Sequence, residues 1–141
     1  MSSWIRDRAE SAVNAAKESW EAIKDKSHPR DFELYRVIAR VYGGLDVCMS
    51  HLVSLRQRSI PADYAAKLGV FLNLYPTYQQ YGTELRQMLE FRHCYTHYYE
   101  RRRLGELVRI TKGETNHLLQ MGLKMMEKLN MELGKLNPVL N

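Results

Sequence analysis

The chain has 141 residues, of which 45% are hydrophobic and 26% charged, a balance that excludes a disordered tail and allows one core but not two ordinary domains. Its net charge of +5 and its pI of about 9.3 favour an acidic partner. We therefore predict a single domain over residues 1–141, with one core and one site.

Neither a membrane span nor a secretory signal is expected from the sequence. The longest nearly apolar run, residues 68–75, is far below the roughly 20 residues that a bilayer requires. The opening MSSWIRDRAE mixes charges of both signs, whereas a secretory signal has a basic end followed by an apolar stretch. Cys48 and Cys94 lie in apolar-periodic segments and fit reduced core residues better than a disulfide. We expect a cytoplasmic protein with no membrane partner.

The first helical segment, residues 3–26, carries one apolar stripe. The stripe consists of Val13, Ala16, Trp20 and Ile23. Five acidic and five basic side chains cancel along this segment, whereas a membrane anchor would have a basic polar face. We interpret it as a helix of the domain or an accessory to it.

A second helix is expected after the break at residues 27–30. Asp31 is its predicted N-cap, because a carboxylate there can accept hydrogen bonds from the free amides of the first turn. Gly43 and Gly44 lie inside the helix and indicate a kink or a close helix approach, since each costs about 1 kcal/mol there. Spacings of four and three define a seam for packing along another helix, formed by Leu34, Ile38, Val41, Leu45, Cys48, Leu52 and Leu55.

Three more helices are predicted, and no segment reads as a strand. Prolines separate a helix over residues 62–74 from its neighbours, and residues 77–83 are a short helical turn or a loop. A fourth helix covers residues 84–107, and a last one covers residues 114–136. The stripe of the fourth is Leu85, Met88, Arg92, Tyr95 and Tyr99; that of the last is Leu118, Met121, Met125, Leu129 and Leu133. The predicted fold class is all-α, an up-and-down bundle of four to five helices.

The fourth stripe contains a charge. Arg92 stands between Met88 and Tyr95, at a position that the pattern assigns to an interior or an interface, where a charge needs a partner or a ligand. Residues 86–112 hold seven basic and three acidic side chains, so this segment carries four of the five net positive charges of the chain. Such clustering attracts polyphosphates, so nucleic acid is the leading partner class.

Residues 91–99 read FRHCYTHYY, which places Arg92, four residues, His97, one residue and Tyr99 in order. This order resembles the motif of HepT-like toxins in the HEPN superfamily: arginine, a four-residue gap, histidine, a spacer and tyrosine. The preceding residues, IPADY at 60–64 and LRQMLEF at 85–91, are also similar to that family's approach to its motif. The resemblance extends over residues 34–135, although His93 stands where the family more often has asparagine.

The resemblance implies an HEPN-like fold and a metal-independent endoribonuclease of toxin–antitoxin type that needs no cofactor. Its 2′-hydroxyl attack on RNA yields a 2′,3′-cyclic phosphate. His97 suits the general base, because an imidazole exchanges protons near neutral pH, and Arg92 can stabilise the phosphate charge with its planar fork. His93 could share acid–base work, and Tyr99 could orient the phosphate or stack on a base. The candidate RNA-binding residues are Arg101, Arg102 and Arg103.

Five residues apart on a straight helix is about 140° of rotation, so Arg92 and His97 would not face one ligand. Either the helix is distorted between them or two copies meet. HEPN toxins are usually dimers whose two motifs line one cleft, so the resemblance implies a homodimer. It also implies a possible nucleotidyltransferase antitoxin as a partner, which could modify Tyr99.

Other interpretations remain open at this point. Arg92 could be a structural arginine paired with Glu90 or Glu84. Glu90, His93 and His97 share a helix face and could bind a metal, and the arginine run could be a solvated surface. At the level of function, the chain could be a non-catalytic HEPN helper domain that binds a nucleotidyltransferase or a nucleotide, or a plain helical interaction module.

Overall fold

A computed structural model describes residues 2–136 and confirms the all-α prediction. Within this range the chain forms six α-helices and one 3-10 helix, with no strand. No helix in the described range is long and apolar enough to span a membrane. The elements are α1 (Ser2–Glu21), α2 (Asp31–Ser54), α3 (Tyr64–Leu74), η1 (Pro76–Tyr81), α4 (Gly82–Thr96), α5 (Tyr98–Leu104) and α6 (Lys112–Leu136).

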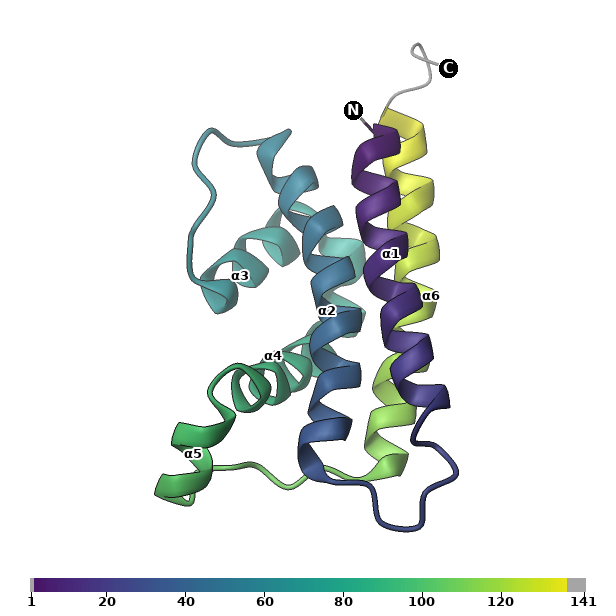
Figure 1. Cartoon of the computed structure of the whole chain (residues 1–141). Coiled ribbons are helices and arrows are strands. Elements are labelled where there is room, and N and C mark those ends of the chain that lie inside the picture. The colour runs from purple at the N-terminus through teal and green to yellow at the C-terminus, as the bar shows by residue number, and fades with distance from the viewer. Residues whose placement is uncertain (1, 137–141) are drawn as a thin grey trace.

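Three long helices, α1, α2 and α6, lie side by side (Figure 1). The helix α2 lies at the centre and packs against α1, α6 and α4. Along the bundle α1 runs opposite to α2, whereas α6 runs in the same direction as α2 (Figure 1). The shorter helices α3, α4 and α5 lie on the other side of α2. An extended segment returns the chain from α5 to α6 along one end of the bundle.

Most residues of the predicted apolar stripes are buried, although Trp20 is only partly so. On α2 the seam residues from Leu34 to Leu52 are buried, but Leu55 is 50% exposed because the helix ends one residue earlier, at Ser54. All five stripe residues of α6 are buried. Cys48 and Cys94 are free and buried as predicted, and burial raises the pKa of the Cys48 thiol to about 11. Periodicity alone thus located about half of the buried apolar residues.

The start of α2 differs from the prediction. Arg30 is the N-cap residue, and its backbone N–H donates to the Glu33 carboxylate over 3.0 Å. The Lys26 ammonium donates to the same carboxylate at 2.8 Å, and these bonds lower the pKa of Glu33. The prediction of Asp31 as the N-cap was therefore wrong. Asp31 is the first helical residue, and its carboxylate has no hydrogen bond or ion pair within residues 2–136.

The two glycines of α2 mark a close helix approach without a break in the helix. A Cβ added at Gly44 would lie 2.9 Å from the backbone oxygen of Ala9 and 3.1 Å from Cγ2 of Val13, both on α1. A Cβ added at Gly43 would have no atom within 4 Å. Only Gly44 is therefore required for α1 and α2 to pack at this distance.

Gly44→Ala is expected to destabilise the protein by up to about 2 kcal/mol, because the helix-propensity gain of about 1 kcal/mol offsets only part of an overpacking cost of about 1–3 kcal/mol. Gly43→Ala is the matched control and should raise stability by about 0.5–1 kcal/mol. Thermal and denaturant unfolding of the two variants measures the difference. Equal effects at the two positions would contradict this account of the α1–α2 contact.

Candidate functional site

The predicted fourth helix is divided at His97, inside the motif. His97 has φ −111° and ψ 35°, outside helical geometry, and it separates α4 from α5. Its backbone N–H donates to the carbonyl of His93 at 3.0 Å, and its own carbonyl accepts from Arg101 at 2.9 Å. The bend turns Tyr99 off the predicted stripe, so Tyr99 is 80% exposed while Leu85 and Met88 are fully buried.

Aromatic packing on both sides of the bend accounts for its position. Tyr95, in the last turn of α4, stacks on Phe32 with ring centroids 5.0 Å apart. Tyr98, the first residue of α5, meets the same ring edge-on, also at 5.0 Å. One aromatic ring from the start of α2 thus contacts both helices, and such contacts offset the backbone bonds lost at a bend.

Arg92 is half-buried and lies against α3. Its guanidinium carbon is 3.9 Å from the centre of the Tyr64 ring, a cation–π contact. No carboxylate within the described part of the chain lies within 4.0 Å of this guanidinium. Glu90, one of the two acids considered as its partner, pairs with Arg101 instead. The N–H groups of Arg92 are therefore not committed to an acid of its own chain.

His93 and His97 form a pair of imidazoles at the bend. Their ring centroids are 6.1 Å apart and the ring planes differ by 18°. His93 is half-buried and His97 is exposed. Among residues 2–136, no three His, Cys, Asp or Glu side chains are grouped so that they could hold a metal ion, and this includes Glu90, His93 and His97. Two neighbouring imidazoles can instead act as a proton acceptor and a proton donor.

The bend does not bring Arg92 and His97 together in one chain. The His97 ring lies beside that of His93, as expected for residues four apart on a helix. Arg92 is one residue before His93, so its side chain leaves α4 about 100° away around the helix axis. Arg92 contacts Tyr64 on the side of α3. Arg92 on α4 therefore contacts α3, whereas His97 lies between α4 and α5 beside His93.

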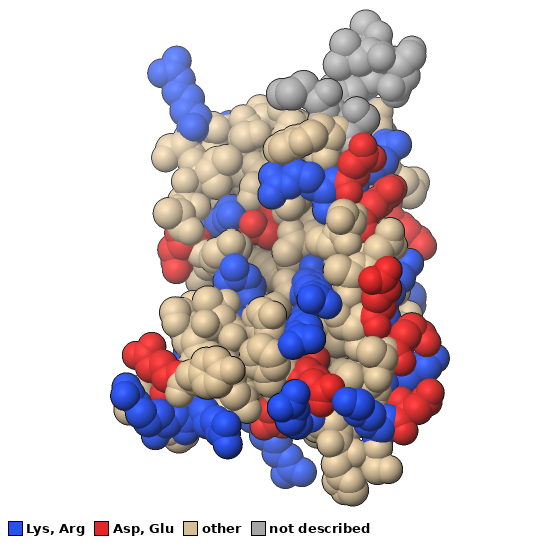
Figure 2. Space-filling model, in the orientation of Figure 1, with Lys and Arg blue, Asp and Glu red and all other residues tan. Residues whose placement is uncertain are grey.

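The three arginines of α5 have different surroundings. Arg101 donates to the Glu90 carboxylate at 2.8 Å and to the Cys94 sulfur at 3.5 Å, so it ties α5 to α4. The hydrogen bond to Glu90 raises the pKa of Arg101. Arg102 and Arg103 are exposed, and basic side chains gather over α5 at the lower left of Figure 2. The free basic surface of the motif region therefore consists of Arg102 and Arg103 more than of Arg101.

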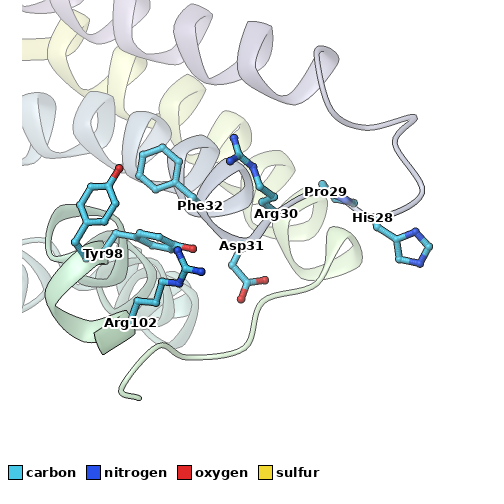
Figure 3. Close-up of a pocket in the computed structure, with 8 residues that line it drawn as sticks. His28, Pro29, Arg30, Asp31, Phe32, Tyr98 and Arg102 are labelled. Atoms are coloured by element: carbon cyan, nitrogen blue, oxygen red, sulfur yellow. The ribbon is translucent and has the colours of Figure 1, made fainter. Parts of the chain in front are cut away.

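An open groove of about 580 Å³ lies between α5 and the start of α2 (Figure 3). Two exposed residues of α5 line it, Tyr99 and Arg102, and both are candidate site residues of the sequence analysis. The remaining lining residues are His28, Pro29, Arg30, Asp31, Phe32 and Tyr98. The groove thus adds a second set of residues, from positions 28–32, to the motif region.

Sequence reasoning missed the proximity of residues 28–32 to the motif. From sequence alone this segment reads as a helix break followed by a cap, and the two parts of the groove are more than sixty residues apart. The prediction that Asp31 is the N-cap implied that its carboxylate is occupied by backbone amides, so the free carboxylate was not expected. An available signal was Phe32, an aromatic residue two positions before Leu34, where the apolar seam of α2 begins.

The fold and the site together define an all-helical bundle with two imidazoles at a helix bend, an uncommitted arginine and an aromatic, arginine-lined groove. A comparison of the chain with protein-family models, with curated proteins and with solved structures found no match in any of the three. The functional interpretation therefore depends on the residues themselves.

Proposed function

We propose that the protein is a metal-independent endoribonuclease of the HEPN, HepT-like type. The observation that supports this most directly is the state of Arg92: a permanent positive charge, half-buried, with no carboxylate within 4.0 Å in the described range. A charge in that state is free to bind an anionic ligand. Phosphate fits its planar fork of donors. The imidazole pair on the same helix supplies the proton transfer that RNA cleavage requires.

In the proposed reaction His97 removes the proton of the 2′-hydroxyl. The 2′-oxygen attacks the adjacent phosphorus, and the bond from phosphorus to the 5′-oxygen breaks. His93 donates a proton to the leaving 5′-oxygen, so the products are a 2′,3′-cyclic phosphate and a 5′-hydroxyl. Arg92 stabilises the extra negative charge on the phosphate oxygens in the transition state.

A second copy of the chain would complete this site. Because Arg92 contacts α3 and His97 lies past the end of α4, the arginine that serves one histidine is proposed to come from the partner subunit of a homodimer. Leu104 and Val108, close to the motif in sequence, are 55% and 38% exposed and could be covered by such a partner. Tyr99 is 80% exposed, so its hydroxyl would be accessible to a nucleotidyltransferase antitoxin.

Purified wild-type protein is expected to cleave single-stranded RNA equally well with and without EDTA, because the proposed reaction uses side chains alone. Mass spectrometry of the fragments should show 2′,3′-cyclic phosphate and 5′-hydroxyl ends. If EDTA abolished cleavage and zinc or manganese restored it, the reaction would be metal-dependent. If no RNA were cleaved, the helper-domain alternative would replace the nuclease.

A further inference from the structure

The groove between α5 and the start of α2 contains groups that the proposed cleavage does not use. These are an exposed aromatic ring, Tyr99, an exposed guanidinium, Arg102, and a half-buried carboxylate, Asp31. Recognition of one nucleotide of a single strand needs a ring that stacks on the base, a cation near the phosphate and a directed group for the base edge. The groove holds at least one of each.

Tyr99 is the ring that is free to stack. It meets Tyr98 edge-on, with ring centroids 5.7 Å apart and an interplanar angle of 84°. Tyr98 also packs against Phe32, so these two rings form the wall of the groove. With 80% of its surface exposed, Tyr99 offers ring surface to a base without any rearrangement of the core.

Asp31 is the directed group. Glu33 takes the capping role at the start of α2, so Asp31 makes no hydrogen bond or ion pair within residues 2–136. Figure 3 shows its carboxylate on the side of α2 that faces Arg102, whereas the ring of His28 points away from the groove. A partly desolvated carboxylate without a donor is a place where a ligand's donors would be favourable.

The chemistry of the carboxylate selects among the four bases. Its two oxygens accept two parallel hydrogen bonds. The Watson–Crick edge of guanine offers two adjacent donors, N1–H and the 2-amino group. Adenine and cytosine place a ring-nitrogen acceptor beside their amino group, and uracil has one N–H between two carbonyls. Each of these three bases would place a hydrogen-bond acceptor opposite a carboxylate oxygen, where no hydrogen bond can form.

We propose that this groove is a guanine-binding subsite for RNA. Tyr99 stacks on the base, Asp31 accepts from N1–H and the 2-amino group, and Arg102 neutralises the neighbouring phosphate. This subsite rests on the proposed nuclease function. Tyr99 follows His97 by two residues, so their Cα atoms are at most about 7.6 Å apart. A guanine in the groove and a phosphate at His97 can therefore belong to neighbouring nucleotides.

Titration of the wild-type protein with GMP, IMP and AMP, followed by calorimetry or NMR, tests the base preference. GMP should bind about 10-fold or more tightly than AMP, since the loss of hydrogen bonds to a charged group costs about that factor. IMP retains N1–H but lacks the 2-amino group, so its affinity should lie between the two. Asp31→Asn should remove the preference for GMP, and Tyr99→Leu should weaken the binding of all three nucleotides. Asp25→Asn, at an exposed aspartate outside the groove, is the matched control.

The titrations involve no cleavage, so they report on the subsite even if the nuclease proposal fails. Equal affinity for GMP and AMP, or a preference that survives Asp31→Asn, would overturn the subsite and leave the nuclease proposal intact. Mapping of cut positions then separates the two sources of guanine. Cuts next to guanine, lost in Asp31→Asn, support the RNA subsite. Selective GMP binding without guanine-dependent cuts would overturn it and assign the groove to a free guanine nucleotide.

Discussion

His97→Ala is expected to lower the rate of RNA cleavage by about two to four orders of magnitude, which is the usual contribution of a general base. The fold should remain intact, because the side chain is exposed and its backbone has a negative φ that alanine can adopt. Cleavage assays and thermal melting on the same preparation measure both effects. His93→Ala should also lose activity, since the proposed acid for the leaving 5′-oxygen is removed.

His117→Ala is the matched control for these variants. His117 is an exposed histidine on α6, away from the bend, and its replacement should change neither cleavage nor melting. A folded His97→Ala protein that cleaves RNA as fast as the wild type would rule out the proposed mechanism. Loss of activity together with loss of the fold would instead assign a structural role to the residue at the bend.

Arg92→Ala is expected to stay folded and to lose cleavage by about 10²–10³-fold, the effect of removing one donor that stabilises transition-state charge. The stability cost should be about 0.5–2 kcal/mol, because the variant loses the contact with Tyr64 but leaves no buried acid unpaired. Arg92→Lys should recover little activity, since lysine retains the charge without the planar fork. Cleavage rates and denaturant unfolding check both statements.

Arg56→Ala is a close control, because the Arg56 guanidinium lies 4.6 Å from the centre of the Tyr75 ring in a similar cation–π contact outside the motif. It should show a comparable loss of stability without any loss of cleavage. Unfolding of Arg92→Ala, or full activity of folded Arg92→Ala, would assign a purely structural role to Arg92. Full activity of Arg92→Lys would show that the charge suffices without the planar fork.

The same two variants test whether the site is shared between subunits. If Arg92 of one subunit serves His97 of the other, mixed dimers of Arg92→Ala and His97→Ala contain one intact site. Random exchange should then restore about a quarter of the wild-type activity. No recovery after proven subunit exchange would show that both groups act within one chain.

The helical class and about half of the buried core could be predicted from the amino-acid pattern. The three-and-four spacing from Leu34 to Leu52 and from Leu118 to Leu133 predicted buried stripes, and the structure confirms them. Such stripes can be recognised in a sequence because burial of apolar surface is the largest favourable term in folding. On a helix the buried positions recur with the helical period, so the apolar residues do too. The unusual charge at Arg92 was visible for the same reason, as a departure from that period.

Three features could be read only from the folded chain: the bend at His97, the free carboxylate of Asp31 and the groove between residues 28–32 and α5. Each depends on a choice between local alternatives that differ by about 1 kcal/mol, such as one capping bond or another. Contacts between distant segments settle these choices: Phe32 packs against Tyr95 and Tyr98 around the bend. Periodicity records which side of a helix is buried, but not which distant residue lies against it.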